Sequence, residues 1–141
     1  MDTRVEPTNL ALGAGAATSA TGLRWTALGA AAAVAKTSGD EWLAIGASAA
    51  SSNTTGTLFV ALGFRAAAQS VDGTGFVGVG WEAGRYNTSG HYWVALGARA
   101  ARGNVTGSNF VAVGYKAAYV CSGDYFTAAG REAGEAASSS S

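Results

Sequence analysis

The sequence predicts an all-β protein, a parallel β-solenoid of about eight coils of about 17 residues each. Two observations predict it: a glycine that returns every 16 or 17 residues, and an aromatic residue that returns in phase with that glycine. A fixed period determines the architecture, so each period is read as one coil and equivalent positions are expected to stack along the axis. The glycines are Gly13, Gly29, Gly46, Gly63, Gly80, Gly97, Gly114 and Gly130.

Each coil is expected to begin with a short strand, as in Phe59-Val60-Ala61-Leu62, whose side chains alternate between two faces. After the glycine bend, a second strand of small residues is expected, with alanine at the eighth position of every coil. A polar turn with a second glycine column, such as Gly73 and Gly90, completes the coil. Alanine also favours helices, but two glycines per coil would interrupt any helix after about two turns.

The alternation leaves open which face of the strand lies inside the coil. We expect the aliphatic second and fourth positions, such as Val60 and Leu62, to point inward and form a thin core against the alanine columns. The aromatic first position then lies outside as a stripe too apolar to remain in water, which predicts a subunit interface in a homotrimer. The alternative is that the aromatic residues lie inside their own coil and the aliphatic ones outside. The interface candidates are Trp25, Trp42, Phe59, Phe76, Trp93, Phe110 and Phe126.

Charged residues of both signs share the seventh position of the coils. Arg65, Glu82, Arg99 and Lys116 follow one another at this position, which predicts an exposed ladder of charges. Such exposed pairs contribute at most about 1 kcal/mol each, so they favour register and solubility more than stability. A second set of aromatic residues is expected on the surface and is a candidate for ligand recognition: Phe64, Trp81, Tyr86 and Tyr115.

Composition argues against several partners. Lys plus Arg and Asp plus Glu are both 9, so the net charge is zero and nothing indicates binding to nucleic acid or to an anionic membrane. The longest apolar stretch, Ala27 to Ala35, is too short to span a bilayer, so no membrane partner is expected. Cys121 is the only cysteine and the first seven residues lack a secretory signal, which indicates a protein made in a reducing cytoplasm.

Catalytic and metal chemistry are not expected. The left-handed hexapeptide acyltransferases share a Leu-Gly-x-x-Ala element with this chain, but their triangular coil needs three such units where this one has a single unit per 17 residues. The only histidine, His91, lies in a polar turn. Carboxylates such as Asp40, Asp72 and Asp124 occupy different positions in their coils, so neither a metal nor a cofactor is expected. Asn53, Asn87 and Asn104 begin sequons, which we interpret as turn chemistry.

The units Gly80-Trp81-Glu82-Ala83-Gly84-Arg85-Tyr86-Asn87-Thr88-Ser89-Gly90 and Phe110-Val111-Ala112-Val113-Gly114-Tyr115-Lys116-Ala117-Ala118 resemble a repeat of phage tail-fibre and other virion surface proteins. That repeat is similar to the head repeats of YadA-type trimeric autotransporter adhesins, which implies a left-handed, trimeric β-roll. The resemblance covers residues 8 to about 137. The expected domains are an N-terminal attachment peptide at 1–8, a β-roll at 9–137 and a disordered serine tail at 138–141.

The resemblance implies a non-enzymatic structural protein of a phage particle. It would be a capsid decoration or cement protein, a head fibre or a short tail-fibre component, made in the host cytoplasm and located on the virion surface. The implied partners are two further copies of the chain and other capsid or tail proteins. The alternative function is a receptor- or glycan-binding adhesin at a fibre tip, with a host-surface glycan as ligand. A hexapeptide-type acyltransferase is the less favoured alternative.

Overall fold

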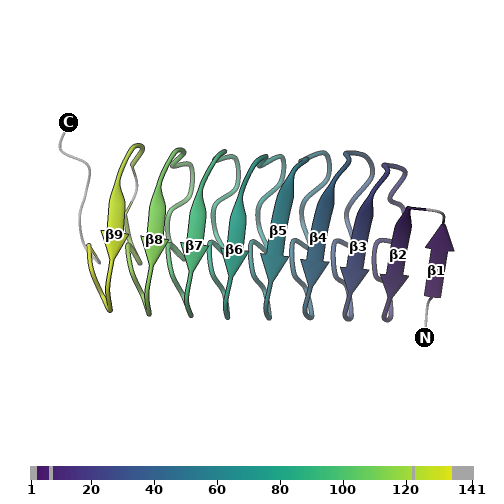
Figure 1. The fold of residues 1–141 in the computed structure, drawn as a ribbon, viewed down its shortest axis with the longest axis horizontal. Coiled ribbons are helices and arrows are strands. Elements are labelled where there is room, and N and C mark those ends of the chain that lie inside the picture. The colour runs from purple at the N-terminus through teal and green to yellow at the C-terminus, as the bar shows by residue number, and fades with distance from the viewer. Residues whose placement is uncertain (1–2, 7, 122, 135–141) are drawn as a thin grey trace.

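The protein is a parallel β-solenoid, as the sequence predicts. The computed structural model describes residues 3–6, 8–121 and 123–134, and these contain strands and turns but no helix. One sheet holds the nine strands in chain order, and β2 to β9 run parallel (Figure 1). The strands are β1 (Thr3–Glu6), β2 (Asn9–Leu12), β3 (Trp25–Leu28), β4 (Trp42–Ile45), β5 (Phe59–Leu62), β6 (Val77–Val79), β7 (Val94–Leu96), β8 (Val111–Val113) and β9 (Thr127–Ala129).

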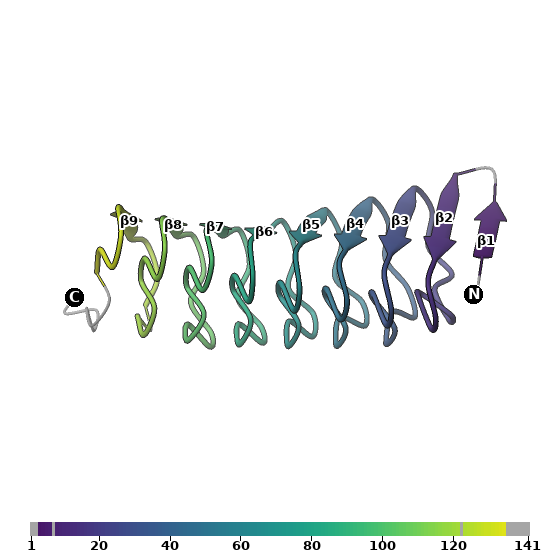
Figure 2. The ribbon, with the colours of Figure 1, turned by 90° about the horizontal axis from the view of Figure 1, so that it is seen from below.

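The stacking register follows the repeat. Trp25 pairs with Trp42, and Val60 pairs with Val77, so equivalent positions of successive coils lie side by side. Seen from below, the strands run along one side of the body and the remainder of each coil lies on the other side (Figure 2). Each coil therefore presents two different surfaces, one made by the strand and one made by the turns that follow it.

The first strand departs from the repeat. β1 runs antiparallel to β2, with Thr3 opposite Leu12 and Glu6 opposite Asn9. It lies within the segment predicted to be an attachment peptide, so part of that segment forms the edge of the sheet. Attachment itself stays a prediction, and the predicted serine tail at 138–141 lies outside the described residues.

The aromatic column lies inside its own coil, so the interpretation that placed it on the outside was wrong. Six of the seven aromatic residues are at most 3% exposed, and Phe126 is partly buried. They therefore cannot form the predicted subunit interface. The fully packed members are Trp25, Trp42, Phe59, Phe76, Trp93 and Phe110.

The geometry of the coil explains why the large rings are inside. Neighbouring rings stack with centroids 4.6 to 5.8 Å apart and planes within 10° of parallel. This spacing matches the separation of about 4.8 Å between paired strands, so flat rings fill a narrow interior without gaps. Buried alanines at positions three, eight and nine, such as Ala61, Ala66 and Ala67, leave room for them. The tryptophan N–H groups are also satisfied, as Trp25 Nε1 donates to the Gly22 carbonyl at 2.8 Å.

The predicted second strand of small residues does not form. At the seventh and ninth positions the backbone is left-handed, with φ of 56° at Arg65 and 50° at Ala67. Alternate N–H groups then bond to neighbouring coils or within the turn: Ala67 N–H reaches the Ala83 carbonyl at 2.9 Å, whereas Ala66 N–H reaches Gly63 at 3.2 Å. A β-strand requires extended, negative φ throughout, so this segment is a series of tight turns.

The sequon asparagines lie in a buried column and bond to the backbone of the turn. Asn53, Asn87 and Asn104 are fully buried. Asn87 Oδ1 accepts the Gly90 N–H at 2.7 Å, and its Nδ2 donates to the Gly107 carbonyl of the next coil at 2.9 Å. The interpretation as turn chemistry is therefore confirmed. Cys121 lies at the same position of its coil, where burial raises the pKa of its thiol.

Lys36 occupies this asparagine column in the second coil. Its side chain is fully buried, and Nζ donates to Asn53 Oδ1 at 2.7 Å and to the Gly56 carbonyl. Desolvation lowers the pKa of Lys36 from 10.5 to about 8, although the negative charge of Asp40 acts in the opposite direction. The amine therefore carries an energetic cost that an asparagine would not.

We expect Lys36→Asn to stabilise the protein near pH 7 by up to about 3 kcal/mol, because the buried charge is removed and the asparagine column is restored. Below pH 8 the amine is charged in both states, so the burial cost is complete. Between pH 8 and 10.5 the folded state releases the proton while the unfolded state retains it, so wild-type stability rises with pH. Urea unfolding between pH 7 and 10.5 should show that the difference in free energy of unfolding between the two proteins narrows as the pH rises. A difference that widens with pH would contradict the cost assigned to the buried, charged amine.

Candidate functional site

The outer face of the sheet is apolar along its whole length. With the aromatic residues inside, the second and fourth strand positions point to solvent and are all partly or largely exposed. We call this surface the aliphatic face. It consists of Leu10, Leu12, Thr26, Leu28, Leu43, Ile45, Val60, Leu62, Val77, Val79, Val94, Leu96, Val111, Val113, Thr127 and Ala129.

The aliphatic face is uncharged and long. Eight coils at about 4.8 Å give a length of about 38 Å, and two side-chain columns give an area on the order of 400 Å². This area is comparable to the largest apolar patch on a typical monomer, and such patches often serve function. The sequence correctly predicted an exposed apolar stripe but assigned it to the wrong column.

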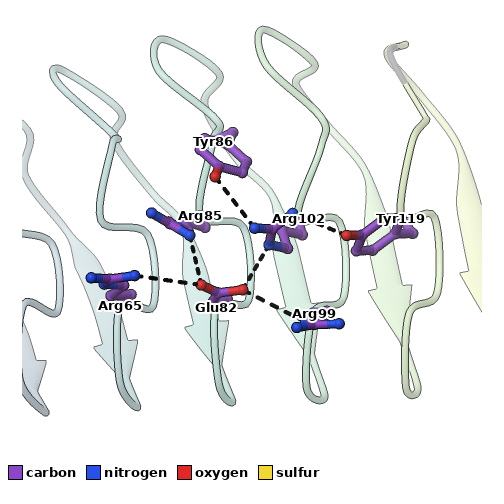
Figure 3. A network of polar contacts seen from close by, with 7 residues as sticks. All are labelled: Arg65, Glu82, Arg85, Tyr86, Arg99, Arg102 and Tyr119. Carbon is purple, nitrogen blue, oxygen red and sulfur yellow. Dashed lines mark hydrogen bonds and ion pairs between the residues drawn. The ribbon is translucent and has the colours of Figure 1, made fainter.

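A second surface, of opposite character, lies on the turns that follow the glycine bend in the fourth to seventh coils. Arginines converge there on a single carboxylate, and the tyrosines Tyr86 and Tyr119 lie beside them (Figure 3). The equivalent positions of the first three coils carry only Ala, Gly, Ser, Thr and Val. We call it the arginine–aromatic surface, and it comprises Phe64, Arg65, Trp81, Glu82, Arg85, Tyr86, Arg99, Arg102, Tyr115, Lys116 and Tyr119.

Glu82 is the centre of this surface rather than a rung of an exposed charge ladder. Its side chain is only 6% exposed. Arg85 Nη1 lies 2.6 Å from Oε1 and Arg102 Nε lies 2.7 Å from Oε2, whereas Arg65 and Arg99 are at 4.0 and 3.6 Å. The prediction of an exposed ladder was therefore wrong at Glu82, because arginines three positions further along their coils cover it.

The charges around Glu82 keep it ionised. Burial alone would raise the pKa of this carboxyl group, but the hydrogen bond from Arg102 and the positive charges of Arg102, Arg85 and Arg99 outweigh burial and hold the pKa below its ordinary value. Desolvation likewise acts to lower the pKa of Arg102, and Glu82 reverses that effect. Glu82 therefore stays a carboxylate and orients its arginines well into the acidic range.

Arg102 links the carboxylate to two tyrosines. Its Nη1 donates to the Tyr119 hydroxyl at 2.9 Å and its Nη2 to the Tyr86 hydroxyl at 3.3 Å (Figure 3). Both hydroxyls accept in these bonds, so each keeps its own O–H to donate. Arg85 also stacks on the Tyr86 ring, with its guanidinium carbon 4.7 Å from the ring centroid. The central part of the surface is thus held by several contacts at once.

The predicted recognition aromatics lie on this surface. Phe64, Trp81 and Tyr115 are 45%, 45% and 41% exposed, and Tyr86 is partly buried. The guanidinium of Arg99 lies 4.3 Å above the Trp81 ring, which is close enough for a cation–π contact. Their recognition role remains a prediction, but the structure places each of them beside a positive charge.

The sequence reasoning missed Arg85, Arg102 and Tyr119. All three occupy the tenth position of consecutive coils, where earlier coils carry Thr18, Val34, Ser51 and Ala68. The signal was present as a change of character along one column. The seventh position alone does not reveal it, because the change lies three places further along the coil.

The histidine and the carboxylates of the polar turns are the remaining groups with catalytic or metal-binding chemistry. His91 is partly buried in its turn, and its Nδ1 accepts the Thr74 N–H at 3.1 Å, so its role there is to order the backbone. Within residues 3–6, 8–121 and 123–134 no group of three or more His, Cys, Asp or Glu side chains is arranged to hold a metal ion. In the same ranges no helix has the length and hydropathy to cross a membrane.

Comparison with known proteins gives no match: no protein-family model, no curated protein and no solved structure is significantly similar to the chain. Function is therefore inferred from the two surfaces, together with the resemblance of the repeat units.

Proposed function

We propose that this chain is a non-enzymatic structural protein of a phage particle and that it assembles as a homotrimer through the aliphatic face. The observation that carries the proposal is the uncharged, regularly spaced apolar surface along the whole sheet. The solenoid body supplies a stiff scaffold, because its hydrogen bonds join every coil to its neighbours.

Copies of the same chain are the occupants that fit the aliphatic face best. Its exposed side chains recur at the strand spacing of about 4.8 Å, and the aliphatic face of another copy has the same spacing and the same length. Each chain can bury about 400 Å² of this face in a dimer or in a trimer, so the area alone does not choose between them. The resemblance of the repeat units to trimeric β-rolls favours the trimer.

The particle location rests on the resemblance of the repeat units to virion surface proteins. A rigid trimeric prism suits a capsid decoration protein, a head fibre or a short tail-fibre component, all of which need reach and stability rather than catalysis. Mass spectrometry of purified particles and immunogold labelling should find the protein on the virion surface. Its absence from purified particles would overturn the location while leaving the trimer untouched.

A single lysine on the aliphatic face tests the trimer. We expect Val113→Lys to be monomeric by light scattering at concentrations where the wild type has three times the chain mass, because three lysines would be buried together. Val105→Lys is the matched control: Val105 is 46% and Val113 38% exposed, but Val105 lies in the polar turn. A monomeric wild type, or equal dissociation of both variants, would reject the trimer.

A further inference from the structure

The arginine–aromatic surface carries a large excess of positive charge. Arg65, Arg85, Arg99, Arg102 and Lys116 give five positive charges against the single carboxylate of Glu82, although the whole chain has a net charge of zero. The excess is therefore local, and it was hidden in the overall composition. Glu82 is shared by the four arginines and neutralises one of the five positive charges, so this surface keeps a net excess of four.

Several guanidinium groups keep donors available for a ligand. Arg65 and Arg99 contact Glu82 only at 4.0 and 3.6 Å, and for the described residues neither makes a side-chain hydrogen bond. The Nε atoms of Arg85 and Arg99 also lack a hydrogen-bond partner within the described chain, but both are buried, so the donors available to a ligand are the outer Nη groups. The guanidinium carbons of Arg65 and Arg99 lie 4.8 and 4.3 Å from the ring centroids of Phe64 and Trp81, and these contacts position the two groups while leaving Nη donors for a ligand.

From this geometry we infer that the arginine–aromatic surface binds an acidic polysaccharide, with its carboxylate groups on the arginines and its sugar rings against the aromatic residues. Guanidinium groups pair with carboxylates through two parallel hydrogen bonds. The half-exposed rings of Trp81 and Tyr115 offer flat apolar surfaces to the C–H faces of sugars. The free O–H groups of Tyr86 and Tyr119 can donate to sugar oxygens.

The arrangement of these groups suits a linear ligand. Equivalent side chains repeat once per coil, at about 4.8 Å, so Arg65, Glu82, Arg99 and Lys116 form a row along the solenoid axis. A polysaccharide lying along this row meets Arg65, Arg99 and Lys116 on the fourth, sixth and seventh coils and small neutral residues on the first three. On the fifth coil Glu82 is buried and Arg85 supplies the positive charge. Binding is therefore directed to one half of the solenoid. The surface lies on the turns, away from the aliphatic face, so the inference is independent of the trimer.

Calorimetry with oligomers of polygalacturonic acid, and with neutral dextran oligomers of the same length, tests this inference. We expect wild-type protein to bind polygalacturonate and not dextran, and binding to weaken as NaCl is raised. Arg99→Ala should reduce the affinity at least tenfold, and Arg24→Ala should change it less than twofold. Both arginines pair with a glutamate, but Arg24 is exposed and pairs with Glu41 outside the surface, whereas Arg99 is partly buried within it.

A second pair of variants tests the aromatic contribution. Trp81→Ala should also weaken binding at least tenfold, whereas Tyr125→Ala should not, although Tyr125 is 81% exposed. Glu82 keeps Arg85 and Arg102 in all of these variants, so each should retain the wild-type circular dichroism spectrum. Equal binding of dextran, equal losses in the controls, no binding by the wild type, or tighter binding of a single-stranded oligonucleotide would each overturn the inference.

Discussion

Replacing Gly97 with alanine should unfold the solenoid or destabilise it by more than about 4 kcal/mol, whereas Gly130→Ala should cost about 1 to 3 kcal/mol. Both glycines stand at the bend after the strand, with φ of 125° and 117°, where an L-residue is strained. A Cβ on Gly97 would lie 2.7 Å from the Gly114 carbonyl oxygen of the next coil. Among the described residues, the nearest atom to a Cβ on Gly130 is the Ala133 side chain at 3.8 Å.

The comparison separates the two reasons for glycine at this position. Backbone strain acts in both variants, but collision with the backbone of the next coil acts only at Gly97, and a hydrogen-bonded neighbouring coil cannot move away cheaply. Urea unfolding followed by circular dichroism, at one protein concentration, measures both. Equal losses would mean that backbone strain alone requires glycine there.

Gly84→Ala should destabilise the protein by about 2 to 4 kcal/mol, and Trp93→Phe should recover much of that loss. The added Cβ would lie 2.3 Å from Cη2 of Trp93, whose indole is fully buried. The ring stacks 4.6 Å from Phe76 and 5.8 Å from Phe110, so it leans toward the coil of Gly84 and has little room to move.

The left-handed backbone at Gly84 is not the reason for glycine there. Its φ is 59°, and the same position holds alanine in other coils, for example Ala67 and Ala101 at 50° and 49°. Those alanines precede Phe76 and Phe110, which lack the second ring. Ala17 and Ala33 at the same position precede Trp25 and Trp42, so the close approach to an added Cβ is specific to Trp93. Thermal unfolding of the two single variants and the double variant measures the coupling. Simple addition of the two single losses would show that the indole does not exclude the Cβ.

The repeat made the architecture predictable, but the alternation of strand residues could not tell which face is inside. Position one is aromatic and position three is Ala or Gly on the same face, and this combination of one large and one small residue is what a narrow interior requires. Gly78 and Gly84 agree with large rings inside only at Trp93, because the coils before Trp25 and Trp42 carry alanine at positions three and nine. The sequence therefore contains one local steric signal and no general rule.

The turns were less predictable than the strands. Alanine favours α-helix and is tolerated in strands, so nothing in its intrinsic preference indicates the left-handed conformation that Ala67 and its equivalents adopt. Inter-coil hydrogen bonds impose it. The arginine–aromatic surface depends on those turns, because they bring the tenth position of one coil beside the seventh. Arg102 therefore reaches Glu82, 20 residues earlier in the chain.

The spacing between bonded residues also has a consequence for how the chain folds. Contacts between coils join residues about 17 apart, as between Thr88 and Val105, in a chain of 141 residues. This corresponds to a relative contact order of about 0.12, low for a protein made of β-structure, so folding by successive addition of coils should be fast. Each new coil forms contacts only with the coil before it, about 17 residues away, however many coils the chain has. We therefore expect duplication or loss of a whole coil to leave the folding rate little changed. The length of the solenoid is then free to vary with the reach its task requires.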